Sequence, residues 1–128
     1  MLLCKTTLGK SPIHGIGVFA AHDIPKGMVI WEFTRGIDQE IPAASIEKLP
    51  ALAQACIRKY AYRKPDSDIY VLCGDDTRFF NHSEEPTVIS SSEDGPDIAV
   101  RDIRTGEELT IDYRTFDADA ERKLRSFS

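Results

Sequence analysis

Short apolar runs separated by turn residues dominate the chain. Residues 15–20 read as a turn that opens into a strand, and residues 28–33 follow the turn signal at 23–27 as a second strand. After residue 68 the runs become rich in β-branched and aromatic side chains, which favour strands. These predicted strands are 69–73, 87–90, 98–103 and 108–113, punctuated by turn residues at 74–76, 93–96 and 105–106.

One segment between the two groups of strands has a helical period instead. Ser45 is a candidate N-cap, and Pro50 either fits the first turn or breaks the segment into two short helices. Residues 117–127 predict one or two amphipathic turns at the C-terminal end. The order of strands, helix and strands predicts a β-rich α+β fold, without the alternation typical of a parallel nucleotide-binding sheet. The apolar positions at helical spacing are Ile46, Leu49, Leu52, Ala53, Cys56, Ile57 and Tyr60.

The length and composition fit one domain, which we take as residues 1–128. With 128 residues and 41% hydrophobic residues, the chain is long enough for one core. No apolar run approaches the roughly 20 residues of a membrane span, and the N-terminus lacks a signal-peptide pattern. We therefore expect a soluble intracellular protein, cytoplasmic or associated with the nucleus or nucleoid. Cys4, Cys56 and Cys73 lack paired spacing, so we expect buried reduced thiols rather than a disulfide or a metal site.

The charge distribution narrows the choice of partner. A net charge of −5 disfavours a broad nucleic-acid surface. Acidic residues concentrate between Asp66 and Asp97, where Arg78 is the only base. Two interpretations remain open: a solvated face, or an acidic rim that attracts basic peptides.

Three separated motifs point to a family. Residues 15–20 (GIGVFA), followed by IPKG at 24–27, resemble the opening motif of SET domains. Residues 78–83 (RFFNHS) look like that family's R-F-x-N-H-S segment, and residues 106–113 (GEELTIDY) are similar to its closing motif. Residues 31–36 are a looser relative of its E-Y-x-G element. The resemblance covers about residues 10–113 and leaves 114–128 as a tail. It implies several short β-sheets, a helical insert and a C-terminal pseudoknot.

The resemblance also implies an activity: transfer of a methyl group from S-adenosylmethionine to a lysine side chain of a protein. In such a site Tyr113 is the catalytic residue, since its hydroxyl orients the amine. The transfer is an in-line displacement, so its rate depends on alignment. A desolvated channel and the sulfonium charge both lower the lysine pKa, so no general base is nominated. The residues implied in cofactor binding are Gly15, Ile16, Gly17, Asn81 and His82, where glycines let the backbone approach the cofactor closely.

The remaining site predictions concern the substrate channel and the tail. Phe33, Tyr70 and Phe80 are the predicted channel residues, although Phe33 stands where the family often has tyrosine. Tyr60, Tyr62 and Tyr70 are each either channel or core residues. Phe116 is predicted to cover the adenine, with Phe127 as the alternative. Arg78 and Asp112 form either an ion pair that fixes the two motifs or separate exposed groups.

Several departures from the family pattern leave alternatives open. Residues 84–87 (EEPT) replace the family's C-x-P-N, and 88–92 lack an aromatic residue, so the number of methyl groups added is not predicted. The alternative to an enzyme is a catalytically inactive SET-fold module that binds protein or cofactor. A methyltransferase acting on small molecules or nucleic acid is disfavoured by the narrow channel. The expected partner is a basic, histone-like protein or peptide, with no nucleic acid, no membrane and a possible homodimer.

Overall fold

The computed structural model describes residues 1–92 and 95–125. Its elements are β1 (Thr6–Lys10), β2 (Ile16–Ala20), β3 (Val29–Trp31), β4 (Gln39–Pro42), α1 (Ala43–Glu47), α2 (Ala51–Tyr60), β5 (Tyr62–Arg63), β6 (Ile69–Leu72), the 3-10 helix η1 (Asp76–Phe79), β7 (Asn81–His82), β8 (Val88–Ser90), β9 (Asp97–Ala99), β10 (Glu108–Ile111), the 3-10 helix η2 (Tyr113–Thr115) and α3 (Ala120–Arg125). The predicted β-rich α+β fold is confirmed.

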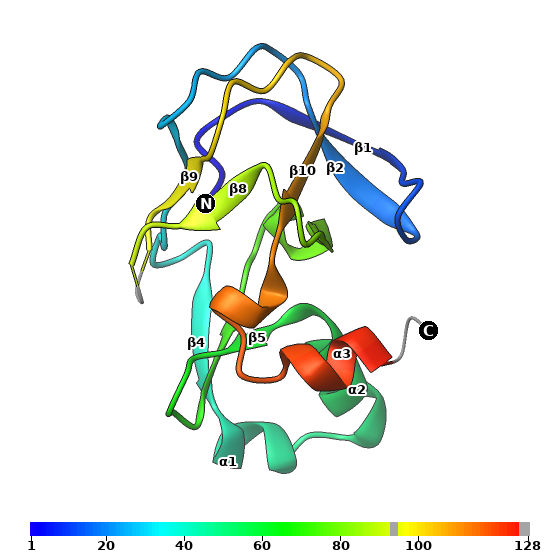
Figure 1. Cartoon of the computed structure of the whole chain (residues 1–128). Helices are drawn as coiled ribbons and strands as arrows, with labels where there is room; N and C mark the ends of the chain where they lie inside the picture. Colours follow the sequence, from blue (N-terminus) through cyan, green and yellow to red (C-terminus); the bar gives the residue numbers. More distant parts are fainter. Residues whose placement is uncertain (93–94, 126–128) are drawn as a thin grey trace.

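The last strand of the chain, β10, lies in the middle of the larger sheet. Its order is β1-β2-β10-β8-β9-β3, and β7 also pairs with β10. Strand β10 is antiparallel to β2 but parallel to β7 and β8, with Thr110 opposite Asn81 and Ile111 opposite Val88. The three sequence motifs are therefore neighbours in one sheet, around β10 (Figure 1).

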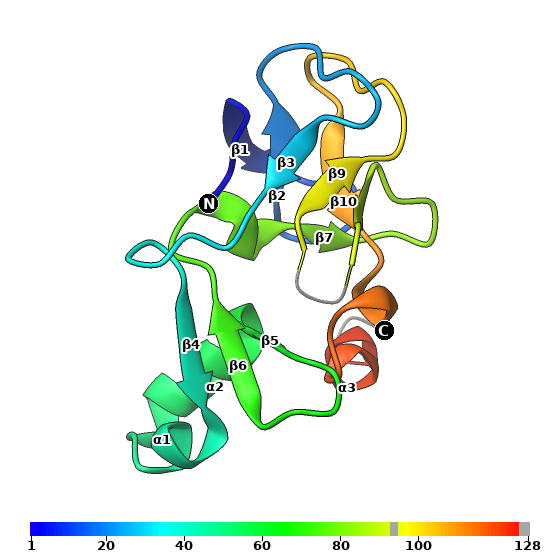
Figure 2. The ribbon, with the colours of Figure 1, turned by 90° about the vertical axis from the view of Figure 1, so that its left-hand side faces the viewer.

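A smaller sheet and the helices form the other end of the molecule. Strands β4, β6 and β5 pair in that order, all antiparallel. Figure 2 shows this sheet and helices α1 and α2 below the larger sheet, with α3 at the side of the smaller sheet. The insert between β3 and η1 thus builds a separate lobe.

The hydrophobic core lies inside the larger sheet. Strands β2 and β10 contribute Val18 and Leu109, both fully buried. The turns that follow β2 and β9 add Ile24 and Ile103, which also form a reciprocal backbone bridge. This bridge joins the IPKG turn to the segment that leads into the GEEL motif, and so fixes the two motifs relative to each other.

The predicted helical segment forms two short helices. Pro50 breaks it into α1 and α2, which settles the open alternative, and Ser45 lies within α1 rather than at its N-cap. Leu52 is 87% exposed and Cys56 is also exposed. The expected burial of all three thiols is therefore wrong, because Cys56 lies on α2, which buries no residue fully, and Cys4 is only partly buried. All three cysteines are free.

Several strands end at other residues than predicted. The predicted strand 98–103 is only Asp97–Ala99, because residues 100–103 turn back toward Ile24. The predicted strand 108–113 ends at Ile111, and Tyr113 begins η2, with Asp112 capping it by accepting from Arg114 N. Strands β1, β4, β5 and β7 carry no clear alternating pattern and were not predicted. In the described residues, no helix is both long and apolar enough to cross a membrane.

Candidate active site

A hydrogen-bond network joins the glycine turn to the NHS and GEEL motifs. Asn81 is 5% exposed, and its Nδ2 donates to the carbonyls of His14 and Ile16 at 3.0 and 3.2 Å. The same atom donates to Glu108 Oε2 at 2.9 Å, and the Ser11 hydroxyl donates to Glu108 Oε1 at 2.8 Å. One amide and one carboxylate thus hold the turn against the two strands. Sequence reasoning did not single out Ser11 or Glu108, because their pairing spans 97 positions.

The two glycines of the turn serve different needs. Gly15 has a φ of +49°, a region that glycine adopts without strain, and a Cβ there would meet open space. A Cβ on Gly17 would lie 2.6 Å from Glu108 Oε2 and 3.0 Å from Ser11 Cβ. Gly17 is therefore required by this internal network, whatever its relation to a cofactor.

His82 connects the NHS motif to Tyr113. Its Nδ1 accepts a hydrogen bond from the Tyr113 backbone N–H at 3.1 Å, and the two rings meet edge-on with centroids 5.3 Å apart. Asp112 Oδ1 lies 3.6 Å from the same nitrogen. The ring is thus a hydrogen-bonded structural group. Asn81 and Tyr113, 32 positions apart, lie on the two segments that this contact joins.

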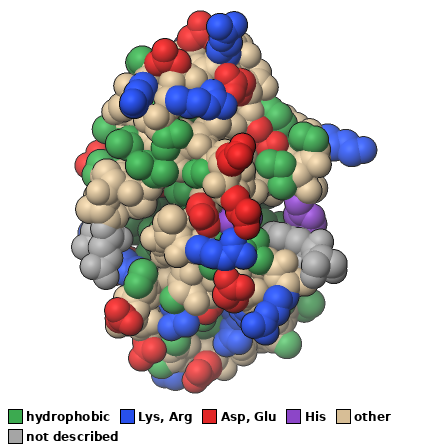
Figure 3. Space-filling model, viewed as in Figure 1, with side chains coloured by type: hydrophobic (Ala, Val, Ile, Leu, Met, Phe, Trp, Pro, Cys, Tyr) green, Lys and Arg blue, Asp and Glu red, His purple; other side chains and the backbone are tan. Residues whose placement is uncertain are grey.

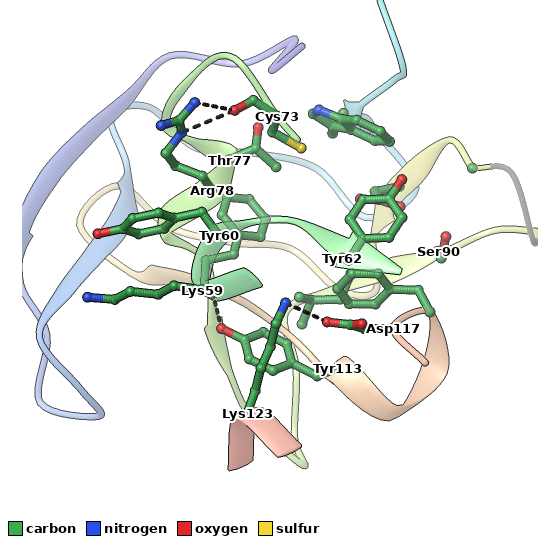
Figure 4. Close-up of a pocket in the computed structure, with 16 residues that line it drawn as sticks. Lys59, Tyr60, Tyr62, Cys73, Thr77, Arg78, Ser90, Tyr113, Asp117 and Lys123 are labelled. Atoms are coloured by element: carbon green, nitrogen blue, oxygen red, sulfur yellow. Dashed lines mark hydrogen bonds and ion pairs between the residues drawn. The ribbon is translucent and has the colours of Figure 1, made fainter. Parts of the chain in front are cut away.

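A cavity of about 70 Å³ opens beside Tyr113, between the larger sheet, the insert and the tail (Figure 4). Its walls combine aromatic rings with a few polar groups. Figure 4 shows Tyr113 and Lys123 on one side, Cys73 and Arg78 on the opposite side, and Ser90 across from Lys59. The aromatic residues that line it are Trp31, Tyr60, Tyr62, Phe80, Tyr113 and Phe116.

The Tyr113 hydroxyl is fixed by the backbone. It donates to the Phe80 carbonyl, and among the described residues no group donates to it, so its lone pairs can accept. Burial raises its pKa well above the usual value, and the charges of Asp117 and Glu108 add to the effect. The phenol therefore stays neutral throughout the ordinary pH range.

The tail closes one side of the cavity. Phe116 packs edge-on against Tyr62 at 5.0 Å between ring centroids and against Tyr113 at 6.1 Å. Asp117 accepts from Lys123 Nζ at 2.7 Å, and the Lys123 ammonium lies 5.9 Å from the centre of the Tyr113 ring. Phe127, the alternative for the adenine cover, lies outside the described residues.

One ion pair and one hydroxyl hold this tail on the insert. Asp119 accepts from Arg63 Nε at 2.9 Å and from the Tyr70 hydroxyl at 3.0 Å. Arg122 adds a third contact to the same carboxylate at 3.3 Å. Burial raises the pKa of Asp119, but these hydrogen bonds outweigh it and hold the pKa below the ordinary value.

The structure separates the three predicted channel residues. Phe80 lines the cavity, whereas Phe33 and Tyr70 do not belong to its lining. Strand β3 ends at Trp31, so the chain leaves the sheet before Phe33 and Trp31 faces the cavity instead. Tyr70 turns its hydroxyl to Asp119, and Tyr62 from the neighbouring strand takes the lining position. No local signal in the sequence distinguishes these tyrosines.

Arg78 and Asp112 do not pair with each other. Arg78 donates from Nε and Nη2 to the Cys73 carbonyl at 3.1 and 2.8 Å, while Asp112 faces His82. Arg78 thereby fixes the end of β6 beside the cavity.

The acidic stretch does not form one face. Asp66 and Asp68 lie in the turn between β5 and β6, Glu84 lies between β7 and β8, and Asp97 is buried. Glu93 and Asp94 lie outside the described residues. Figure 3 shows acidic and basic side chains interspersed on the visible face. Of the two alternatives, the acidic rim finds no continuous acidic surface on that face.

The sequence of this chain matches a known domain family and several longer proteins. The SET domain profile matches residues 15–114. The chain is 32% identical over 124 residues to human Histone-lysine N-methyltransferase 2B and over 123 residues to Histone-lysine N-methyltransferase ATX2 of Arabidopsis thaliana. Each match covers 90% of this chain, but only 4% and 11% of those much longer proteins.

Solved structures agree on the fold. One is ctPRC2, from the Polycomb Repressive Complex 2 of Chaetomium thermophilum, in an autoinhibited conformation bound to S-adenosylmethionine. It matches with a TM-score of 0.67 at 23% identity, over 96% of this chain and 17% of that chain. The glycine turn, the NHS strand and the closing strand all fall within the matched profile, and the chain belongs to the SET domain family.

Proposed function

We propose that this chain is an S-adenosylmethionine-dependent methyltransferase that acts on a lysine side chain of a protein. The observation that carries the proposal is the junction of motifs at Tyr113. Its backbone is held by His82, its hydroxyl by Phe80, and its ring lines the aromatic cavity. Relatives named histone-lysine methyltransferases match most of this chain, and they support the same activity.

The residues around the glycine turn fit the cofactor. Space is open beside Gly15, and within the described residues Asn81 Oδ1 receives no hydrogen bond, so it is available to an amino group. The neighbouring Glu108 carboxylate supplies negative charge for a cationic ligand. When bound, S-adenosylmethionine supplies a methyl group on a positively charged sulfur. We propose Gly15, Ile16, Gly17, Asn81 and His82 as its contacts.

The cavity fits a long side chain with a cationic end. Aromatic walls exclude water from an aliphatic stem and favour an ammonium group. In this dry setting the substrate amine loses its proton more readily, because desolvation disfavours its charged form. The fixed Tyr113 hydroxyl accepts from the amine and aligns it, and Phe80 and Tyr62 hold the stem. We further propose that Phe116 borders the cofactor and that the substrate is a basic, histone-like peptide.

The test is transfer of labelled methyl from S-adenosylmethionine to a mixture of basic proteins. We expect labelled lysine with the wild type and a loss of about 100-fold in Tyr113→Phe, as expected for a group that positions the reacting atoms. Tyr70→Phe is the matched control, because it also loses one hydroxyl bond but outside the cavity, and Arg63 still holds Asp119 of the tail. It should retain most activity. S-adenosylmethionine binding without transfer to any protein would instead favour the inactive binding module.

A further inference from the structure

A buried carboxylate in the cavity has no cationic partner. Asp97 is 9% exposed and lines the cavity together with Ser90. The Ser90 hydroxyl donates to the Ser92 carbonyl at 3.1 Å and lies close enough to Asp97 to lower its pKa. Within residues 1–92 and 95–125, no lysine or arginine forms an ion pair with it, and the Met1 ammonium is the one positive group that acts on it appreciably. Burying such a charge is costly unless it is paired, so the position calls for an explanation.

Among the described residues, a polar atom beside Asp97 lacks a hydrogen-bond partner. Trp31 and Asp97 are register partners across β3 and β9, and Trp31 is 3% exposed. The indole Nε1 is buried and, among the described residues, has no hydrogen-bond acceptor. An unmatched donor and an unmatched anion thus line the same cavity as Tyr113. Buried polar groups in native proteins are nearly always paired, so this combination indicates a place that a ligand or water completes.

The charges around the cavity are segregated. Lys59 and Arg78 lie over the Tyr60 ring at 5.2 and 5.8 Å, on the side opposite Ser90 (Figure 4). Lys123 is neutralised by Asp117. The cations of the cavity are therefore engaged elsewhere, and the Asp97 end remains anionic.

We propose that Asp97 is the counter-ion that captures the ammonium group of the substrate lysine in the cavity. This inference deepens the proposed function and rests on it. The carboxylate has been desolvated during folding, so an incoming ammonium gains the attraction without a further desolvation cost of the acid. The Trp31 ring beside it adds a face that attracts cations. Asp97 acts in binding, before the amine loses its proton, and Tyr113 acts in alignment.

The pKa of Asp97 agrees with this role. Burial raises it to about 6, so the group is mostly ionised at pH 8 and mostly protonated at pH 5. The groups that face it are the Ser90 hydroxyl, the Met1 ammonium and the Cys73 thiol, whose pKa burial raises far above this range. The other charged groups that line the cavity are Lys59, Arg78, Asp117 and Lys123. The Cys73 thiol therefore does not change charge between pH 5 and pH 8.

The experiment uses n-butylammonium as a probe of the lysine end and 1-butanol as its neutral counterpart. Trp31 is the chain's one tryptophan, so its indole N–H signal in NMR reports directly on the cavity. We expect a saturable shift with n-butylammonium at pH 8, weakened about tenfold in Asp97→Asn, the loss typical of a charged hydrogen bond. The wild-type affinity should fall similarly at pH 5, whereas that of Asp97→Asn should not change with pH.

Asp68→Asn removes an exposed carboxylate in the β5–β6 turn and serves as the matched control. Equal affinity in Asp97→Asn, equal binding of 1-butanol, or no pH effect on the wild type would each overturn the inference. The comparison of wild-type affinity at pH 5 and pH 8 uses no variant, so it tests the inference even if Asp97→Asn folds poorly. Methyl transfer is measured separately. Transfer with an unchanged KM in Asp97→Asn would overturn this inference alone, whereas ammonium binding without any transfer would overturn the proposed function alone.

Discussion

Asn81 and Glu108 are joined by a hydrogen bond of 2.9 Å, although 27 positions separate them. The bond lies where β7 runs parallel to β10, and the same Asn81 amide reaches the carbonyls of the glycine turn. The NHS and GEEL motifs therefore share one polar network. Since Gly17 leaves room only for the Glu108 carboxylate, the three motifs depend on one another sterically as well as electrostatically.

Glu108→Gln should weaken S-adenosylmethionine binding about three- to tenfold. The amide keeps the shape of the carboxylate but removes the negative charge beside a cationic ligand. Isothermal titration calorimetry measures the Kd. Glu107→Gln is the control, since that side chain pairs with Arg101 away from the turn. An unchanged Kd in Glu108→Gln would show that the carboxylate is only structural.

Gly74→Ala should destabilise the fold by about 3 kcal/mol or more, which places it among the most damaging single changes. A Cβ at this position would lie 1.7 Å from the Ile37 carbonyl oxygen, which is backbone and cannot rotate away. Gly9→Ala is the comparison, because its Cβ would touch only the Phe19 ring at 3.4 Å. Urea unfolding followed by circular dichroism gives both values, and equal losses would contradict the steric account.

Asp97→Asn should make the protein more stable at pH 7, by about 2 kcal/mol. Asp97 has a folded pKa of about 6, above the value near 3.9 of an unfolded aspartate, so the folded state holds the proton more tightly between these values. Stability therefore falls as pH rises from about 4 to about 6, and the wild type carries the full cost above that range.

The asparagine variant removes this cost, so its advantage should disappear near pH 4. Denaturant unfolding of both proteins between pH 4 and pH 8 checks the crossover. A difference that does not vary with pH would show that the gain has another origin. Greater stability combined with weaker ammonium binding would mark Asp97 as a residue kept for function at the expense of stability.

Much of the fold followed from local patterns. The strands after residues 15 and 68 were predicted because β-branched and aromatic residues alternate with clear turn signals. Strands such as β7, only two residues long, have no such pattern and exist because β10 pairs with them. The exposure of Leu52 could not be predicted from the sequence either, because helical spacing shows that one face of a helix is apolar but not whether another element covers that face.

The sequence by itself determined the family and the three motifs, because each motif is a contiguous run whose residue types carry the signal. It also singled out Tyr113, Phe80 and Phe116, which the tertiary structure gathers around one cavity. Only the tertiary structure decided that Trp31 and Tyr62 replace Phe33 and Tyr70 in that lining. It alone placed Asp97 there, because a strand end and a side-chain direction depend on partners far away in the chain.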